Sequence, residues 1–164
     1  MLDLSRVKDL VGKGDVLALA QYLAEVYPKG LLGERDELVT LLMKAGLNHA
    51  DAVSWAGRLE KEGYAHHLPG SSPRWAFTSK PVSFHELARA IRGEWSEFVG
   101  NSNDALDEAI EFFEQSVGVD REVAQEIYRA LEAAGYASVV YQEGDAFSRD
   151  RVLFDFPEVF TKQV

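Results

Sequence analysis

The sequence predicts a mainly α-helical fold with small β hairpins, an α+β class, arranged as two successive repeats. The main observation is that residues 45–65 (AGLNHADAVSWAGRLEKEGYA) resemble residues 117–137 (VGVDREVAQEIYRALEAAGYA), 72 positions later. The same residue occupies both members of these pairs: Gly46/Gly118, Ala52/Ala124, Leu59/Leu131, Glu60/Glu132, Gly63/Gly135, Tyr64/Tyr136 and Ala65/Ala137. We therefore expect two copies of one supersecondary unit.

Each copy carries the local signals of helix, tight turn, helix and strand. A glycine ends the first helix, and a polar residue, Asn48 or Asp120, caps the next one. Apolar residues then recur at helical spacing, as in Ala52, Trp55 and Leu59. A second glycine is followed by strand-forming residues. The pattern therefore predicts a helix-turn-helix followed by a hairpin in each copy.

Composition is typical of a folded chain without cysteine chemistry. Of the 164 residues 46% are apolar, which is enough for a sizeable core, and none is cysteine. Disulfides, thiol catalysis and thiolate metal sites are thereby excluded. No apolar run approaches the ~18 residues of a membrane span. The first six residues lack the charged start and apolar core of a signal peptide, so we expect a cytoplasmic protein without membrane contact.

Charge divides the chain into unequal halves. Residues 1–82 contain ten Lys and Arg against ten Asp and Glu, whereas residues 83–164 contain seven against seventeen. The net charge of −10 therefore arises in the second half. We expect two domains: residues 1–82, repeat one with an additional N-terminal helix, and residues 83–164, an acidic repeat two with a C-terminal tail.

The elements of repeat one follow from apolar periodicity and from breakers. The predicted helices cover residues 3–11, 15–27, 34–44 and a segment that starts after Asn48. Residues 64–68 and 74–78 are predicted strands, because they flank a turn rich in Pro, Gly and Ser.

Repeat two begins at a capping box formed by Ser83 and Glu86. Helices are predicted at 84–99, 104–116 and 121–134, and strands at 136–141 and 151–156. The first of these helices carries Trp95 and Phe98 in its apolar stripe. Residues 157–164 form the predicted tail.

Three helices followed by a hairpin, twice over residues 14–156, resemble the winged helix-turn-helix superfamily in tandem. The resemblance implies that the third helix of a repeat enters the DNA major groove and that the hairpin, or wing, contacts the backbone or minor groove. It also implies a second role, because tandem acidic winged-helix proteins include adaptors that bind other proteins. The resemblance does not choose between the two roles.

If DNA is bound, repeat one is the candidate, because a nucleic-acid site needs a basic surface. Candidate contacts from the third helix and the wing are His49, Val53, Ser54, Arg58, Lys61, His66, His67, Arg74 and Lys80. The alternative is an ordinary solvated face of mixed charge, which Glu60 and Glu62 favour. In repeat two the corresponding helix carries Glu122 and Glu126, which would repel phosphates.

Neither a metal site nor an active site is expected. His66 and His67 are adjacent on a predicted strand, so their side chains point to opposite faces and cannot share one ion. Phosphate loops, nucleophile elbows and dinucleotide fingerprints are missing from the sequence. We therefore expect a non-enzymatic protein without catalytic residues, cofactor or metal.

The acidic repeat is the candidate for protein contacts. Charged and aromatic candidates are Asp104, Asp107, Glu108, Glu111, Glu114, Phe154, Phe156 and Phe160. Aromatic anchors within a charged rim are common in protein interfaces. We expect an adaptor or regulator whose partner is a basic protein or a second copy of the chain. The alternatives are a DNA-binding transcriptional regulator that uses repeat one, and acids and aromatics that serve only solubility and the core.

Overall fold

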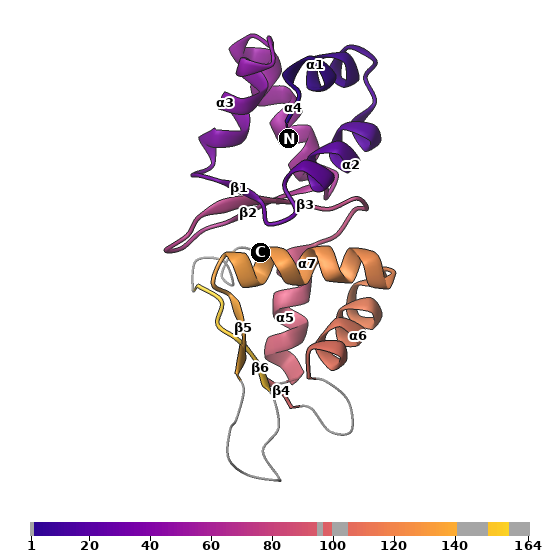
Figure 1. The fold of residues 1–164 in the computed structure, drawn as a ribbon, viewed down its shortest axis with the longest axis vertical. Helices are drawn as coiled ribbons and strands as arrows, with labels where there is room; N and C mark the ends of the chain where they lie inside the picture. Colours follow the sequence, from indigo (N-terminus) through magenta and orange to yellow (C-terminus); the bar gives the residue numbers. More distant parts are fainter. Residues whose placement is uncertain (1, 95–96, 100–104, 141–150, 158–164) are drawn as a thin grey trace. The chain divides into compact units, whose positions relative to one another are not determined.

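The computed structural model describes residues 2–94, 97–99, 105–140 and 151–157 (Figure 1). The chain forms two compact units, Met1–Val82 (unit 1) and Ser83–Val164 (unit 2), each described here by itself. Their boundary lies at Ser83, whose hydroxyl accepts a hydrogen bond of 3.2 Å from the Glu86 amide at the start of the next helix. The mainly α fold with small antiparallel sheets that the sequence predicts is confirmed.

Unit 1 contains four helices and three short strands among its described residues. In chain order they are α1 (Leu4–Gly12), α2 (Val16–Val26), β1 (Leu31–Leu32), α3 (Asp36–Lys44), α4 (His49–Lys61), β2 (Ala65–Leu68) and β3 (Arg74–Phe77). Side chains of Asp3, Asp15 and Asn48 cap α1, α2 and α4 by accepting hydrogen bonds from main-chain amides. The apolar stripes of these helices meet in one core, in which Leu19, Leu42 and Leu59 have no exposed surface, and which the sheet continues through Trp75 and Phe77.

Unit 2 has the same order of elements as unit 1 without α1. The elements are α5 (Phe84–Glu94), β4 (Glu97–Val99), α6 (Ala105–Val117), α7 (Arg121–Ala133), β5 (Ala137–Val140) and β6 (Arg151–Phe154). Its core is built on Leu87, Ile91, Phe113 and Ile127, all of which are at most 1% exposed.

The two sheets share one topology. The order is β1-β3-β2 in unit 1 and β4-β6-β5 in unit 2, and all pairs are antiparallel. In each unit the strand between the first two helices of the repeat pairs with the last strand, so β2 and β5 lie at sheet edges among the described residues.

The predicted helix over residues 84–99 was too long. The helix α5 ends at Glu94, and Glu97–Val99 forms β4, where Phe98 pairs with Val152. Trp95, which was assigned to the same helix, lies outside the described residues. The strand was missed because a three-residue strand has no periodicity of its own, and its partner β6 lies far away in the sequence.

The helices α4 and α7 start and end 72 positions apart, as do β2 and β5. Asn48 and Asp120 cap them with nearly the same backbone angles, φ −73° and ψ 167° against φ −77° and ψ 169°. Gly63 and Gly135 follow the two helices with φ of 86° and 85°, in the left-handed region that favours glycine. The likeness of the two sequence segments therefore extends to their local backbone geometry.

Candidate protein-binding groove

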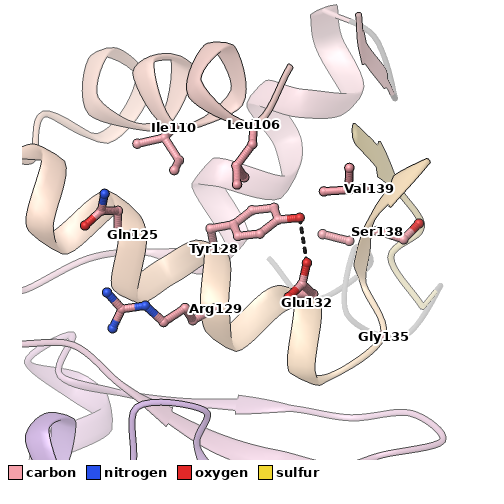
Figure 2. A pocket seen from close by; sticks show the side chains of 10 residues that line it. Leu106, Ile110, Gln125, Tyr128, Arg129, Glu132, Gly135, Ser138 and Val139 are labelled. Carbon is pink, nitrogen blue, oxygen red and sulfur yellow. Dashed lines mark hydrogen bonds between the residues drawn. The ribbon is translucent and has the colours of Figure 1, made fainter. Parts of the chain in front are cut away.

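A groove of about 840 Å³ opens on unit 2 between α6, α7 and β5 (Figure 2). The residues that line it are Leu106, Ile110, Gln125, Tyr128, Arg129, Glu132, Gly135, Ala137, Ser138 and Val139. Aliphatic side chains from α6 and β5 provide an apolar surface, and the polar groups come mainly from α7. An apolar centre beside polar groups is the usual composition of a protein-binding surface.

One pair of side chains fixes the shape of the groove beside β5. The ring of Tyr128 is 5% exposed, and its hydroxyl donates a hydrogen bond of 2.9 Å to Glu132 Oε2, four residues further along α7. Figure 2 shows this pair between α7 and β5, near Ser138, whereas the Arg129 guanidinium extends away from it. Among the described residues no cation forms an ion pair with Glu132. Its carboxylate is therefore held by a neutral donor.

Small side chains on the sheet leave the groove open. Val139 of β5 pairs with Val152 of β6. In unit 1, His67 stands 72 positions before Val139, and it pairs with Trp75 of β3. Two valines thus take the place of a histidine and a tryptophan, whose rings are 5.2 Å apart at their centroids. Val139 has much less volume than His67, and it lines the groove beside α7.

The matching carboxylate of unit 1 has a different environment. Glu60, 72 positions before Glu132, forms an ion pair of 2.6 Å with Arg35. The Arg35 guanidinium lies 5.2 Å from the centre of the Trp75 ring, whose Nε1 donates a hydrogen bond to the Arg35 carbonyl. His67 Nε2 lies 3.3 Å from the carbonyl oxygen of Gly33, and burial lowers the pKa of this histidine. In unit 1 a compact cluster therefore compensates the carboxylate.

The acidic candidates of α6 differ in exposure and in ion pairing. Asp107 is exposed and forms an ion pair of 2.5 Å with Arg121. Glu111 is exposed, whereas Glu108 and Glu114 are half-buried. Asp104 lies outside the described residues. The negative charge of α6 is thus partly compensated by the first residue of α7.

The predicted role of Phe154 as an exposed anchor does not agree with its position. Phe154 is 7% exposed, and its ring lies 5.9 Å from Phe113 and 6.0 Å from Phe156, with which it stacks. Phe156 is half-buried and contacts the Tyr136 ring edge-on at 5.8 Å. Phe154, the last residue of β6, is therefore part of the core of unit 2. Phe160 lies outside the described residues.

The DNA candidates on α4 all lie at the surface. His49, Ser54, Arg58 and Lys61 are exposed, and Val53 between them is 46% exposed. Arg58 also forms an ion pair of 3.0 Å with Glu62, and its guanidinium lies 5.3 Å from the centre of the Trp55 ring. The basic character of this face is therefore reduced by a neighbouring acid.

Two of the wing candidates are buried, which corrects their predicted role as phosphate contacts. Arg74 is 7% exposed and donates hydrogen bonds to the Lys29 carbonyl at 2.9 Å and to the Ser72 carbonyl at 3.2 Å. His66 is 9% exposed, with Nε2 3.0 Å from Thr78 Oγ1. Alternation along β3 predicts one exposed face, but all four of its residues are buried. Lys80 is exposed.

Within the described ranges, no three His, Asp or Glu side chains come together as a metal site would require. His66 and His67 contact different partners, Thr78 and Gly33. None of the described helices is long and apolar enough to span a bilayer.

Comparisons of the chain with protein-family models, with curated proteins and with solved structures give no match. The groove was not among the sequence-predicted sites. Of its lining residues, the sequence singles out Glu132, Gly135 and Ala137, and only as matches between the two repeats. No sequence signal marks it, because the residues of α6, α7 and β5 that line it come together only in the folded unit.

Proposed function

We propose that this chain is a non-enzymatic adaptor or regulator that holds a protein partner in the groove of unit 2. The observation that carries this proposal is the groove itself, in which aliphatic residues from α6 and β5 meet the Tyr128–Glu132 pair. The surplus of acids in residues 83–164 supports a basic partner, because it attracts such a partner over long distances.

We also propose that both units are winged helices. The support for this is their common order of helix, strand, helix, helix, strand, strand and their common sheet topology. In this arrangement α4 and α7 are the third helices and the hairpins β2–β3 and β5–β6 are the wings. The groove then lies where the third helix meets the wing, a surface that an adaptor can use without nucleic acid.

The test is affinity purification from native cells with three baits: the full wild-type chain, Leu106→Glu and Leu32→Glu. Leu106 is half-buried in the groove near the start of α6, where an added carboxylate is compatible with the helix dipole. Leu32 is 62% exposed on β1 and serves as the matched control. Extracts are treated with nuclease in one arm.

We expect a protein that the wild type and Leu32→Glu retain after nuclease and that Leu106→Glu loses. Titration of that purified protein should then show at least about tenfold weaker binding to Leu106→Glu, as for a central interface residue. If all three baits retain the same proteins, the groove is not the binding site. If retained proteins disappear with nuclease, the adaptor role is wrong.

Self-association is tested by sedimentation of the full chain over a range of concentrations. A second copy in the groove would give a dimer that Leu106→Glu dissociates. A monomer at all concentrations removes the second copy as the partner. A chain that ends at Pro157 shows whether the segment beyond it contributes to such a dimer.

DNA binding through unit 1 is the second candidate function, favoured by the exposure of His49, Ser54, Arg58 and Lys61 on one helix. Its test is retardation of random duplex DNA at low salt by the wild type and by the double variant Arg58→Ala/Lys61→Ala. Binding that falls with salt and is lost in the variant would support it. An unretarded duplex would remove it.

A further inference from the structure

We infer that the groove takes an extended, basic segment of a partner protein, which adds as a strand to the edge of β5 that no described strand occupies. This inference deepens the proposed function and depends on it. It names the conformation of the bound segment and the chemistry of its side chains.

The first support is the direction of the β5 backbone groups. The Tyr136 carbonyl accepts a hydrogen bond of 2.8 Å from the Asp155 amide, which directly follows β6. The backbone groups of Tyr136 therefore point toward the chain of β6. In an antiparallel ladder, neighbouring residues alternate in the side to which both their N–H and C=O groups point. The groups of Ala137 and Val139 therefore face away from β6. Among the described residues no further strand pairs with β5 on that side.

The second support is that the open edge and the groove coincide. Ala137, Ser138 and Val139 line the groove and also form β5. A strand added here would receive main-chain hydrogen bonds from Ala137 and Val139, and alternate side chains would enter the groove. Leu106 and Ile110 offer an apolar contact for one of those side chains.

The third support is charge. Glu132 is exposed at the edge of the groove, and its partner among the described residues is the neutral Tyr128 hydroxyl. Glu60, at the matching position of unit 1, is already neutralised by Arg35. A Lys or Arg on the added strand would pair with Glu132 in unit 2 and would have no such acceptor in unit 1. The occupant is therefore a partner segment in which an aliphatic and a basic residue stand two positions apart, because side chains two positions apart on a strand point to the same face.

The edge hydrogen bonds are tested with the full chain and a blocked, fluorescent peptide, measured by anisotropy. Valine and lysine take turns at every second position of the peptide, with threonine between them, so that both side chains lie on one face. Val139→Pro removes the outward N–H of Val139 and leaves the β5–β6 ladder intact, since proline is tolerated at an edge with its nitrogen toward solvent. Val139→Thr retains the N–H and is the matched control. We expect Val139→Pro to bind the peptide about tenfold more weakly and Val139→Thr to bind like the wild type. Circular dichroism confirms that both variants are folded.

A second measurement does not depend on any variant of the protein. Peptides N-methylated at alternate residues are compared in the two registers, because only one register directs its N–H groups toward β5. One register should lose binding and the other should retain it. Equal binding of the two methylated peptides, or binding to Val139→Pro that is as tight as to the wild type, would overturn strand addition.

The charge preference is tested separately with Glu132→Gln and with a peptide in which glutamate replaces lysine. We expect weaker binding of the lysine peptide to Glu132→Gln, and little binding of the glutamate peptide to the wild type. No binding of the lysine peptide, or equal binding of both peptides, would overturn the basic segment. The adaptor proposal itself is tested only by the affinity purification. A partner that no longer binds Leu106→Glu but binds Val139→Pro as tightly as the wild type would support the adaptor role and refute strand addition.

Discussion

Tyr128 donates a hydrogen bond of 2.9 Å to Glu132, whereas the glutamate 72 positions earlier, Glu60, is paired at 2.6 Å with the guanidinium of Arg35. The two carboxylates occupy matching turns of α7 and α4. One is held in place by a neutral hydroxyl and the other is neutralised by a cation. Glu132 can therefore attract a cation from a partner, whereas Glu60 is already paired with Arg35 of its own unit.

Tyr128→Phe should destabilise unit 2 only slightly, by less than about 1 kcal/mol, because the ring stays and the lost hydrogen bond goes to an exposed carboxylate. Tyr128→Ala should cost about 3 kcal/mol, because it removes a buried ring. Urea unfolding followed by circular dichroism measures both. Equal losses for the two variants would show that the hydroxyl, and not the ring, supports the groove.

Gly63→Ala should destabilise the protein more than Gly135→Ala. Both positions have a left-handed φ, which costs a residue with Cβ about 1–2 kcal/mol. At Gly63 an added Cβ would also lie 3.1 Å from the Val82 nitrogen and 3.2 Å from its oxygen, whereas at Gly135 it would have no neighbour within 4 Å. Chemical denaturation of the two variants gives the difference, and equal effects would contradict the predicted clash. By the same reasoning Gly63→Val should cost more than about 1 kcal/mol.

Arg74→Met should destabilise unit 1 by about 1–3 kcal/mol, because the carbonyls of Lys29 and Ser72 lose their donor while the apolar stem stays. Arg58→Met, on the exposed face of α4, should stay within about 0.5 kcal/mol. Thermal unfolding provides the comparison. If Arg74→Met were as stable as the wild type and instead impaired duplex binding, the structural role of Arg74 would be refuted.

The stability of unit 1 should fall as pH falls below about 6.5, and part of that fall should come from His67. Burial lowers the pKa of His67 from its ordinary value of 6.5, so the unfolded chain binds a proton at a pH where the folded chain does not. The contribution of neutral His67 is complete above 6.5 and is lost toward the lower pKa of the folded state. Urea midpoints of the wild type and His67→Gln over this range measure it. Parallel pH profiles for the two proteins would contradict the assignment.

The helices were predictable because their signals are local. Asn48 and Asp120 have the residue types of a helix cap, and Gly63 and Gly135 have the only residue type at ease with their backbone angles. The short strands β1 and β4 were not predictable in this way. Their existence depends on pairing with β3 and β6, which are remote in sequence, and two or three residues carry no period.

The site was less predictable than the fold, because burial in a small sheet depends on both of its faces. The sequence offered Arg74 as a wing cation, but every residue of β3 is buried. The groove is lined by residues of α6, α7 and β5, which come together only in the folded unit. A sequence shows which residues are present. Whether a groove stays open depends on the size of the side chains that the fold brings together.

The equal spacing of α4–β2 and α7–β5 has a consequence for where this chain can change its length. An added residue inside either segment would rotate all later side chains of the helix by about 100° and move the apolar stripe off the core. Residues 69–73, which connect β2 to β3, lie outside any helix, so no such phase exists there. Doubling such a connection costs only about 0.6 kcal/mol of closure entropy. The connection between β2 and β3 is therefore a place where an epitope or a fluorescent reporter can be inserted without disturbing α4.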